Sequence, residues 1–569
     1  MAVRTGSNLQ IKALKDEINV LMDREVRMWN QRSRILWLKN GDGNTKFFHT
    51  RASHRFRKNV ILGINDSHGS WKVEPNEIGG VLINFYQELF TTSNLPLHQE
   101  VLDQIPQLIS KDMNQELMCK FEDWEVVQAL KQMAPMKASG SDGMPHLFFQ
   151  HFWPMIEGDV THSVLSWLNS GTLPHLVNHT FITLIPKKKN PSCVSDYHPI
   201  SLCNVLYKIF SKVLANRLKK FLNNIIIEHQ SAFAKGRLII DNILIAFETL
   251  HTMKHYNSGS NGFMALKLDM SKAYDRVEWV FLENVMRKMG FCKQWIGLIM
   301  VCVKTVTYSI LVNGEPKGLI HPSRGLRQGD PLSLFLFLLC TEGLHGLIKQ
   351  AASNRDITGF RLCRHGPKLT PLFFADDNLL FCRANSTECS KVMDLLSVYE
   401  DVSGQKINKD KTALFFSKSV TEANRQIIKG ILGVREIRHY EKYLGLPSLT
   451  GKGKRASFNY IKERVWRKLQ GWEGKLLSQA GREVLIKAVI QAIPTYAMGC
   501  FKLPMGLCNE IEVMIRKFWW GQKGEKRKVH WLKWSEMTKS KNEGGMGFRD
   551  LALHNDSFLA KQACHLLQD

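Results

Sequence analysis

The chain has 569 residues, of which 44% are hydrophobic, and this composition excludes a wholly disordered protein. Its 77 lysines and arginines exceed its 52 acidic residues and give a formal net charge of +25, which favours a polyanionic partner over the alternative of a merely well-solvated surface. The 12 cysteines include no C-x-x-C pair, the N-terminus has no apolar signal segment, and the longest apolar run is too short to cross a bilayer. We therefore expect no zinc site, no secretion and no membrane partner.

The first predicted element is a basic helical extension over residues 1–75. Apolar positions recur at helical spacing in residues 8–40, and NGDGN (40–44) predicts a turn. A basic-aromatic cluster follows, made of Lys46, Phe47, Phe48, Arg51, Arg55, Arg57 and Lys58. Aromatic groups among cations suit nucleic acid, and a solvated basic helix explains the cluster equally well.

Residues 76–260 are predicted to combine helices with a short strand. KASGSDG (137–143) predicts a turn, and FITLIP (181–186) a strand that leads into the basic cluster Lys187, Lys188 and Lys189. From Pro199 to Ile226 the apolar residues recur three to five apart, which predicts an amphipathic helix.

The next region, residues 261–435, has the strongest patterns. Its predicted elements are a buried strand (263–270), a helix (273–289), a Gly-rich turn (323–331), an apolar helix (332–348) and a strand–turn–strand unit (369–383). The last hundred residues are predicted to be helical, and they are basic and rich in tryptophan.

Three acids lie at the ends of these predicted strands. Asp269 ends one strand, and Asp376 and Asp377 occupy the hairpin turn. If both segments belong to one sheet, the acids converge and raise one another's pKa values unless cations are bound. All-oxygen ligands favour Mg²⁺, and two such ions can activate a 3′-hydroxyl and stabilise a leaving pyrophosphate. A hairpin turn also accepts Asp for structural reasons, so this motif alone leaves the site undecided.

Five motifs together resemble a known family. KLDMSKAYDRVEW, RGLRQGDPLSLFLF, FFADDNLLF, SGQKINKDKT and KYLGLPS have the order and spacing of a reverse transcriptase palm, and the chain resembles the polymerase of plant non-LTR, LINE-type retrotransposons almost end to end. The resemblance implies an α+β right-hand polymerase fold. Its parts would be an N-terminal extension (1–75), fingers (76–260), a palm with an antiparallel sheet (261–435), and a primer-grip hairpin with a helical basic thumb and C-terminal region (436–569).

The resemblance also implies the chemistry and its residues. The activity would be RNA-directed DNA polymerisation, with two Mg²⁺ ions, or Mn²⁺ as the alternative, on Asp269, Asp376 and Asp377. Lys411 would act as general acid near the pyrophosphate, and Tyr274 would exclude a ribose 2′-hydroxyl. The other nucleotide-binding residues would be Met270 through its carbonyl, Gln328, Gly329, Arg237 and Lys187. The primer and template would meet Tyr443, Leu444, Gly445, Arg324 and Trp472.

Several residues depart from the family pattern. The family usually has arginine at His198 and proline at Ser139, Ser141, Lys235 and Leu334. A histidine is mostly neutral near pH 7 and makes no bidentate contact with phosphate, and each departure weakens support for the site. The chain is also expected to lack an endonuclease and to be a fragment. A catalytically weak or inactive nucleic-acid-binding remnant is therefore the alternative function, whereas an RNA-templated RNA polymerase is disfavoured by Tyr274.

The expected partners follow from the same resemblance. They are template RNA, a DNA primer or target, and dNTPs, and the oligomeric state is unreadable from the sequence. The expected location is intracellular, with action in the nucleus after a cytoplasmic ribonucleoprotein stage.

Overall fold

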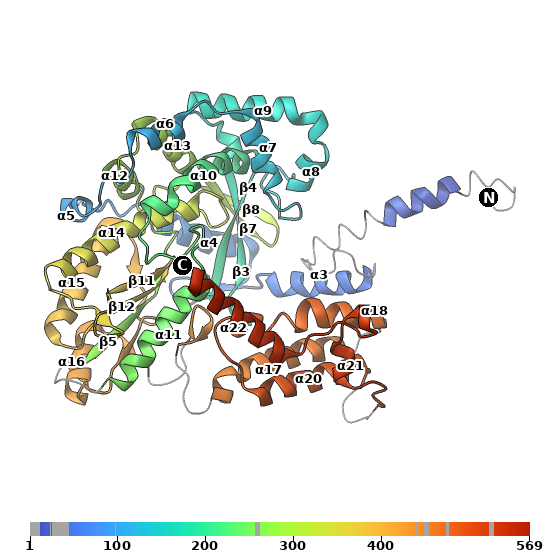
Figure 1. The fold of residues 1–569 in the computed structure, drawn as a ribbon. Coiled ribbons are helices and arrows are strands. Elements are labelled where there is room, and N and C mark those ends of the chain that lie inside the picture. The colour runs from blue at the N-terminus through green and yellow to red at the C-terminus, as the bar shows by residue number, and fades with distance from the viewer. Residues whose placement is uncertain are drawn as a thin grey trace. The chain divides into compact units, whose positions relative to one another are not determined.

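The computed structural model describes residues 12–22, 24, 45–96, 98–256, 262–437, 442–448, 454–473, 477–522 and 528–568. Helices and sheets are mixed along the chain, which confirms the expected α+β class (Figure 1). Two units are present: residues 56–438 form one, and residues 1–55 with 439–569 form the other. The turn predicted at residues 40–44 lies outside the described residues.

A five-stranded sheet lies in the first unit, with strand order β11-β12-β5-β14-β15. Its strands are β5 (Phe263–Leu268), β11 (Pro371–Phe374), β12 (Asp377–Arg383), β14 (Ala413–Phe416) and β15 (Arg435–Glu436). All neighbours are antiparallel except the edge pair β14–β15, which is parallel. The central strand β5 is buried along almost its whole length, which explains its nearly continuous apolar sequence.

The predicted strand–turn–strand unit is the β11–β12 hairpin. Its two-residue turn is Ala375–Asp376, and Ala375 has φ 54°, the left-handed conformation that tight hairpin turns need. The Ala375 N–H donates to Oε1 of the buried Gln230 at 3.0 Å. The side chain of a distant loop therefore holds this strained turn in place.

A four-stranded sheet, also in the first unit, has the order β4-β3-β7-β8. Its strands are β3 (His179–Pro186), β4 (Tyr197–Cys203), β7 (Thr307–Val312) and β8 (Glu315–Ile320). The prediction of a helix from Pro199 is wrong for its first six residues, because Pro199 of β4 pairs with Leu184 of β3 and helix α10 begins only at Val205 (Val205–Ile225). A proline fits there because β4 is an edge strand, where a missing N–H leaves no neighbour unpaired.

The helix predicted over residues 273–289 is also shorter than expected. Helix α12 (Trp279–Met289) starts six residues later, because Lys272 has φ 55° and the chain turns after the short strand β6 (Met270–Ser271). Inside the predicted helix, Glu278 pairs with Arg324 in an isolated β-bridge and the Tyr274 carbonyl accepts from the Leu326 N–H, so tertiary pairing overrides the helical periodicity. Strand β6 itself pairs with β13 (Lys406–Ile407).

The apolar helix predicted from Leu332 is α14 (Ser333–Ser353). It is long and apolar enough to cross a membrane, but 78% of its apolar window is buried, as in the core helix of a globular domain. The other helices of this unit are α4 (Pro75–Phe90), α5 (Gln99–Asp103), α6 (Lys111–Met118), α7 (Asp123–Lys131), α8 (His146–His151), α9 (Trp153–Ser170), α11 (Ile239–His255), α13 (Lys293–Lys304), α15 (Ser386–Ser403) and α16 (Glu422–Leu432).

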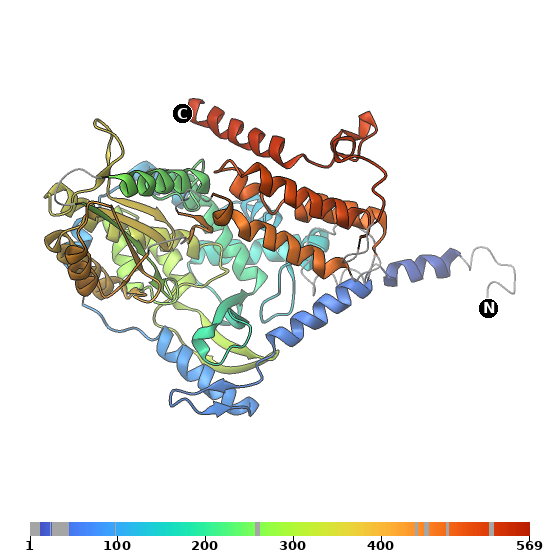
Figure 2. The same ribbon diagram turned by 90° about the horizontal axis from the view of Figure 1, so that it is seen from below.

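The second unit is mainly helical, as its sequence predicts. Helix α17 (Lys454–Glu473) packs along α20 (Met505–Trp519), and Figure 2 shows the two side by side. Its other elements are the hairpin of β16 (Lys442–Tyr443) and β17 (Leu446–Pro447), with α18 (Gln479–Leu485), α19 (Thr495–Met498), α21 (Trp534–Thr538) and α22 (Leu551–Gln568).

Candidate active site

The three acids meet at one end of the five-stranded sheet. Asn378 of β12 pairs with Leu268 of β5, so the next position in the antiparallel register sets Asp377 opposite Asp269. Asp376 precedes Asp377 in the hairpin turn and is exposed, while the other two are half-buried. Strand pairing thus brings together residues that lie more than a hundred positions apart.

The acids repel one another in this arrangement. Burial raises the pKa of Asp269, and the charge of Asp376 raises it further. The pKa of Asp377 is raised in the same way, by burial first and then by Asp376 and Asp269. The cation that opposes this repulsion most directly is Lys411, whose Nζ lies 3.8 Å from Asp269 Oδ1.

The loop that carries Lys411 is tied to the backbone of Asp269. The Asp269 N–H donates to Thr412 Oγ1 at 3.2 Å, and the Asp269 carbonyl accepts from the Asn408 N–H at 2.8 Å. The next residue, Met270, pairs with Ile407 through β6 and β13. The lysine is therefore delivered to the acid by backbone contacts rather than by its own flexible side chain.

The donor set is made of oxygen atoms alone, which suits Mg²⁺ or Mn²⁺. Within the described ranges, no group of three or more His, Cys, Asp or Glu side chains is arranged to hold a metal ion. The acids thus share one end of the sheet in register without forming a closed ligand cage.

Tyr274 lies next to these acids. Its ring stacks on Phe337 with centroids 4.4 Å apart and planes 18° apart, and its carbonyl accepts from the Leu326 N–H at 2.8 Å. Burial raises the pKa of the Tyr274 phenol, and the charge of Asp376 adds to the effect. The ring is thus a rigid, half-buried surface beside the hairpin turn.

Cations from the four-stranded sheet approach the same region. Lys187 follows β3 directly and donates through Nζ to the Ser195 carbonyl at 2.8 Å. Its pKa is lowered by burial and then by Lys411. The pKa of His198 in β4 is lowered by burial, Lys187 and Lys272, while Asp376 opposes the shift. His198 is therefore neutral near pH 7 and lies among lysines.

Two residues of this region, Lys272 and Asp275, were not predicted from the sequence. Asp275 is 3% exposed, and its Oδ1 is 3.5 Å from Gln328 Nε2. Asp275 Oδ2 and Lys272 Nζ are both buried without a hydrogen-bond partner in the part of the chain that the structure describes. Burial raises the pKa of Asp275 to about 6 despite the nearby lysines. The available signal was the run of charged residues in SKAYDR, close to Asp269, because an apolar core does not need charged side chains.

Gly329 has a steric reason to be glycine. Its φ is 121°, and an added Cβ would lie 2.9 Å from the Ser201 carbonyl oxygen. The Ser201 N–H also donates to the Gln328 carbonyl at 2.9 Å. The loop therefore passes too close to β4 for any side chain at this position.

The structure gives Arg237 a different set of partners from the predicted triphosphate. Its guanidinium donates to carbonyl oxygens at the end of α10 and in the following loop, namely those of Asn223, Ile226, Ile227 and Gln230. It therefore closes the C-terminal end of a helix. These contacts do not favour a role in nucleotide binding, which stays a prediction.

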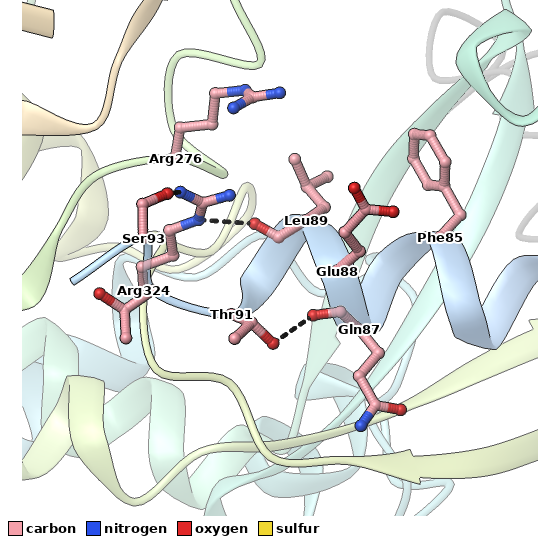
Figure 3. Close-up of a pocket in the computed structure, with 9 residues that line it drawn as sticks. Phe85, Gln87, Glu88, Leu89, Thr91, Ser93, Arg276 and Arg324 are labelled. Carbon is pink, nitrogen blue, oxygen red and sulfur yellow. Dashed lines mark hydrogen bonds between the residues drawn. The ribbon is translucent and has the colours of Figure 1, made fainter. Parts of the chain in front are cut away.

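Arg324 is likewise engaged inside the protein. It is 5% exposed and donates to the Leu89 carbonyl at 2.8 Å and to Ser93 Oγ at 2.6 Å (Figure 3). It lines a pocket of about 550 Å³ together with Arg276, at the C-terminal end of α4. Its contacts hold α4 to the turn before α14 and do not favour the predicted template contact.

The predicted primer-binding residues belong to the second unit. Tyr443 is 2% exposed, and the Leu444–Gly445 turn has φ values of 48° and 83°. The Leu444 carbonyl accepts from the Tyr496 hydroxyl at 2.9 Å. The tight hairpin is therefore well formed, and its contact with primer stays a prediction.

Trp472, expected at the template, is 8% exposed, with its ring 6.0 Å from that of Phe518. It is a core residue between α17 and α20.

At two of the positions where the family usually has proline, the residue present forms a hydrogen bond that proline could not form. Ser141 Oγ donates to Asn204 Oδ1 at 3.0 Å, and the Lys235 N–H donates to Asn223 Oδ1 at 3.1 Å. A proline at either position would lack these donors, so the two loops are held by hydrogen bonds instead of by ring rigidity.

Comparison with known proteins agrees with this geometry. Residues 185–448 match the family model of reverse transcriptase (RNA-dependent DNA polymerase). The chain is 26% identical over 542 residues to the transposon TX1 uncharacterized 149 kDa protein of Xenopus laevis, covering 94% of this chain and 40% of that protein.

Two further relatives match shorter segments. A retrovirus-related Pol polyprotein from the type-2 retrotransposable element R2DM of Drosophila melanogaster is 28% identical over 246 residues, 42% of this chain and 22% of that protein. An uncharacterized mitochondrial protein of Arabidopsis thaliana is 52% identical over 67 residues, 12% of this chain and 55% of that protein. The chain thus spans less than two thirds of the length of each of these relatives.

Proposed function

We propose that the chain is an RNA-directed DNA polymerase of the non-LTR retrotransposon type, which extends a DNA primer on an RNA template; residues 185–448 match the reverse transcriptase family model, and the relatives include retrotransposon proteins. The observation that carries the proposal is the strand register that sets Asp377 opposite Asp269, with Asp376 beside them in the turn. The family uses divalent metal ions, and this all-oxygen set suits them.

The three acids, Lys411 and Tyr274 would each have a role in this reaction. Asp269 and Asp376 would hold two Mg²⁺ ions, with Asp377 beside them, and the bound ions would supply charge neutralisation for the attacking and leaving oxygens. Lys411, held at Asp269, would donate a proton to the leaving pyrophosphate. Tyr274 would close the space beside the sugar against a 2′-hydroxyl.

The incoming triphosphate would lie between the acids and the cations of the four-stranded sheet. Lys187 and Lys272 would attract its phosphates, and Gln328 and Gly329 would present an amide side chain and open backbone to the nucleotide. Template RNA and a DNA primer would be the macromolecular partners, and the expected site of action is the nucleus.

Primer extension tests the proposal. The purified chain is expected to extend a DNA primer annealed to RNA in the presence of dNTPs and Mg²⁺, and Asp376→Asn is expected to reduce the rate by roughly 10³-fold. RNA binding by both proteins should be equal, because Asp376 is exposed and the change to Asn keeps the side-chain volume. Equal product from wild type and variant would reject this site as the source of activity.

The second candidate function is nucleic-acid binding without useful catalysis. The neutral His198 in a position surrounded by lysines favours it, because a neutral ring gives a triphosphate no charge. Tight RNA binding with no extension by the wild-type chain in either Mg²⁺ or Mn²⁺ would support this candidate over the polymerase.

A further inference from the structure

The loop that carries Gln328 and Gly329 is bounded by two buried charges. Arg327 and Asp330 are 5% and 4% exposed, whereas Gln328 is half-buried and Gly329 is exposed. The two residues expected to meet the nucleotide therefore emerge between two side chains that are anchored in the protein interior.

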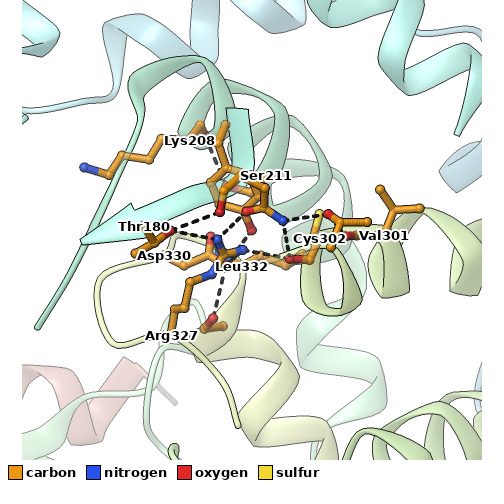
Figure 4. A network of polar contacts seen from close by, with 12 residues as sticks. Thr180, Lys208, Ser211, Val301, Cys302, Arg327, Asp330 and Leu332 are labelled. Atoms are coloured by element: carbon orange, nitrogen blue, oxygen red, sulfur yellow. Dashed lines mark hydrogen bonds and ion pairs between the residues drawn. The ribbon is translucent and has the colours of Figure 1, made fainter. Parts of the chain in front are cut away.

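Arg327 anchors one end of the loop. Its Nη2 donates to the Cys302 carbonyl at 2.8 Å, and its Nη1 donates to Asn178 Oδ1 and, at 3.3 Å, to Thr180 Oγ1 (Figure 4). The guanidinium carbon lies 3.9 Å from the centre of the Tyr207 ring. One side chain thus joins the loop to β3, α10 and α13.

Asp330 anchors the other end. Its Oδ2 accepts from the Tyr207 hydroxyl at 2.9 Å and from Ser333 Oγ at 3.1 Å, and lies 3.6 Å from Arg327 Nη2. Its Oδ1 accepts from the Leu332 N–H at 3.2 Å. Tyr207 therefore contacts both charges, and the carboxylate also closes the first turn of α14.

The backbone between the two charges is fixed as well. The Ser201 N–H binds the Gln328 carbonyl, and Gly329 runs against the Ser201 carbonyl. The Gln328 side chain then faces Asp275 at the edge of the candidate active site. A small shift of either charge would move Gln328 relative to the acids.

We propose that the Arg327–Asp330 pair with Tyr207 is a positioning element that sets Gln328 and Gly329 for the incoming dNTP, an inference that rests on the proposed polymerase function. The pair does not touch the nucleotide. A buried ion pair is weak evidence for stability, because apolar residues of the same volume often serve as well. Positioning by fixed geometry matters more, since a loosened site can lose much of its activity.

Helix α10, which carries Tyr207, also carries a second buried arginine that can serve as a matched control. Arg217 of α10 forms a buried pair with Glu125 of α7, at 2.7 Å and 2.8 Å. It also binds the carbonyls of Leu117, Cys119 and Lys120 and lies 3.7 Å over the Phe121 ring. The parts are the same as around Arg327: a buried arginine, a carboxylate, an aromatic ring and backbone carbonyls. No residue of this second set is a predicted site residue.

The test compares Asp330→Asn with Glu125→Gln in the full chain. Each change keeps side-chain volume, removes one buried negative charge and leaves an arginine unpaired, so both are expected to lower the melting temperature. Only Asp330→Asn is expected to raise the KM for dNTP, by about 10-fold, while Glu125→Gln keeps it within about 2-fold of wild type. Tyr207→Phe removes a single hydrogen bond to Asp330 and is expected to raise KM about 3-fold with little loss of stability.

The outcomes separate this inference from the function on which it rests. An inactive wild-type chain would reject the polymerase proposal itself. An active wild type with the same KM change in Asp330→Asn and Glu125→Gln would overturn the positioning role and leave the polymerase intact. If Asp330→Asn does not fold, Tyr207→Phe decides, and an unchanged KM for dNTP in that variant would overturn the inference.

Discussion

The two sheets of residues 56–438 bring different groups to the same place, acids from one sheet and a lysine with a neutral histidine from the other. The five-stranded sheet supplies Asp269 and the Asp376–Asp377 turn, whereas the four-stranded sheet supplies Lys187 and His198. Their charges interact, because Asp376 acts on the pKa of His198 and Lys411 acts on that of Lys187.

The difference lies in how each sheet fixes its charges. The acids are placed by backbone register, in which a shift of one residue would turn every side chain to the other face. The four-stranded sheet offers a long lysine side chain and a neutral histidine near its strand ends, and the position of Lys187 depends on the Ser195 carbonyl that it binds. The negative end is therefore rigid and the positive end adaptable, which suits fixed metal ions opposite a variable triphosphate.

Tyr274 lies beside the rigid acidic end, and its removal is expected to change sugar selection strongly. Tyr274→Ala should raise incorporation of ribonucleotides relative to deoxynucleotides by about 10–100-fold, since the ring that fills the space beside the sugar is lost. Single-nucleotide extension with rNTP and dNTP measures this ratio. Tyr274→Phe keeps the ring on Phe337 and should keep discrimination, and an unchanged ratio in the alanine variant would return Tyr274 to a purely structural role.

His198 lies at the adaptable end, beside Lys187 and Lys272. His198→Arg should raise kcat/KM for dNTP about 3–10-fold, because a permanent charge with a bidentate donor replaces a neutral ring. Steady-state primer extension over a dNTP series provides the measurement. The matched control is His175→Arg, which adds the same charge before the opposite end of β3, and an equal gain there would show a general charge effect.

Asp275 is a buried acid near Lys272 and Lys187, and its replacement should change the free energy of unfolding. Its pKa is about 6 in the folded chain against an ordinary value of 3.8, so the folded state keeps the proton to higher pH. Stability from this group is therefore fully present below about pH 4 and is lost as the pH rises through about 6. Asp275→Asn should stabilise the chain by about 1–3 kcal/mol at pH 7.5 and by almost nothing at pH 4.

Thermal unfolding at the two pH values measures this difference. Asp159→Asn, at an exposed acid on α9, is the control and should change neither value. If Asp275→Asn raised the free energy of unfolding equally at both pH values, the result would contradict a raised pKa of Asp275 in the folded chain.

The sequence predicted the parts of the site that depend on local patterns. The strand before Asp269 and the hairpin around Asp376 follow from apolar runs interrupted by acids, and Gly329 follows from a Gly-rich turn. The extent of α10 and α12 could not be predicted in the same way, because pairing of Pro199 with β3 and of Glu278 with Arg324 overrides helical spacing.

The contacts and the burial of individual side chains could not be predicted from the sequence either. The sequence shows that Arg237, Arg324 and Trp472 are basic or aromatic, but it does not show that Arg324 and Trp472 are buried against distant segments or that Arg237 closes the end of α10. Conversely, Asp275 gains its unusual pKa only when the fold buries it. Composition near a motif therefore identifies candidates, and only burial distinguishes a ligand-binding cation from a structural one.

Acids from two paired strands are expected to hold divalent metal together, and Mn²⁺ binding measures this without relying on polymerase activity. Titration of Mn²⁺, followed by the electron paramagnetic resonance signal of the free ion, is made in the presence of primer–template and a non-hydrolysable dNTP analogue. Asp269→Asn and Asp376→Asn should each weaken Mn²⁺ binding by at least about 10-fold, whereas Asp159→Asn should leave it unchanged. Wild-type Mn²⁺ affinity in either of the first two variants would contradict a shared metal site.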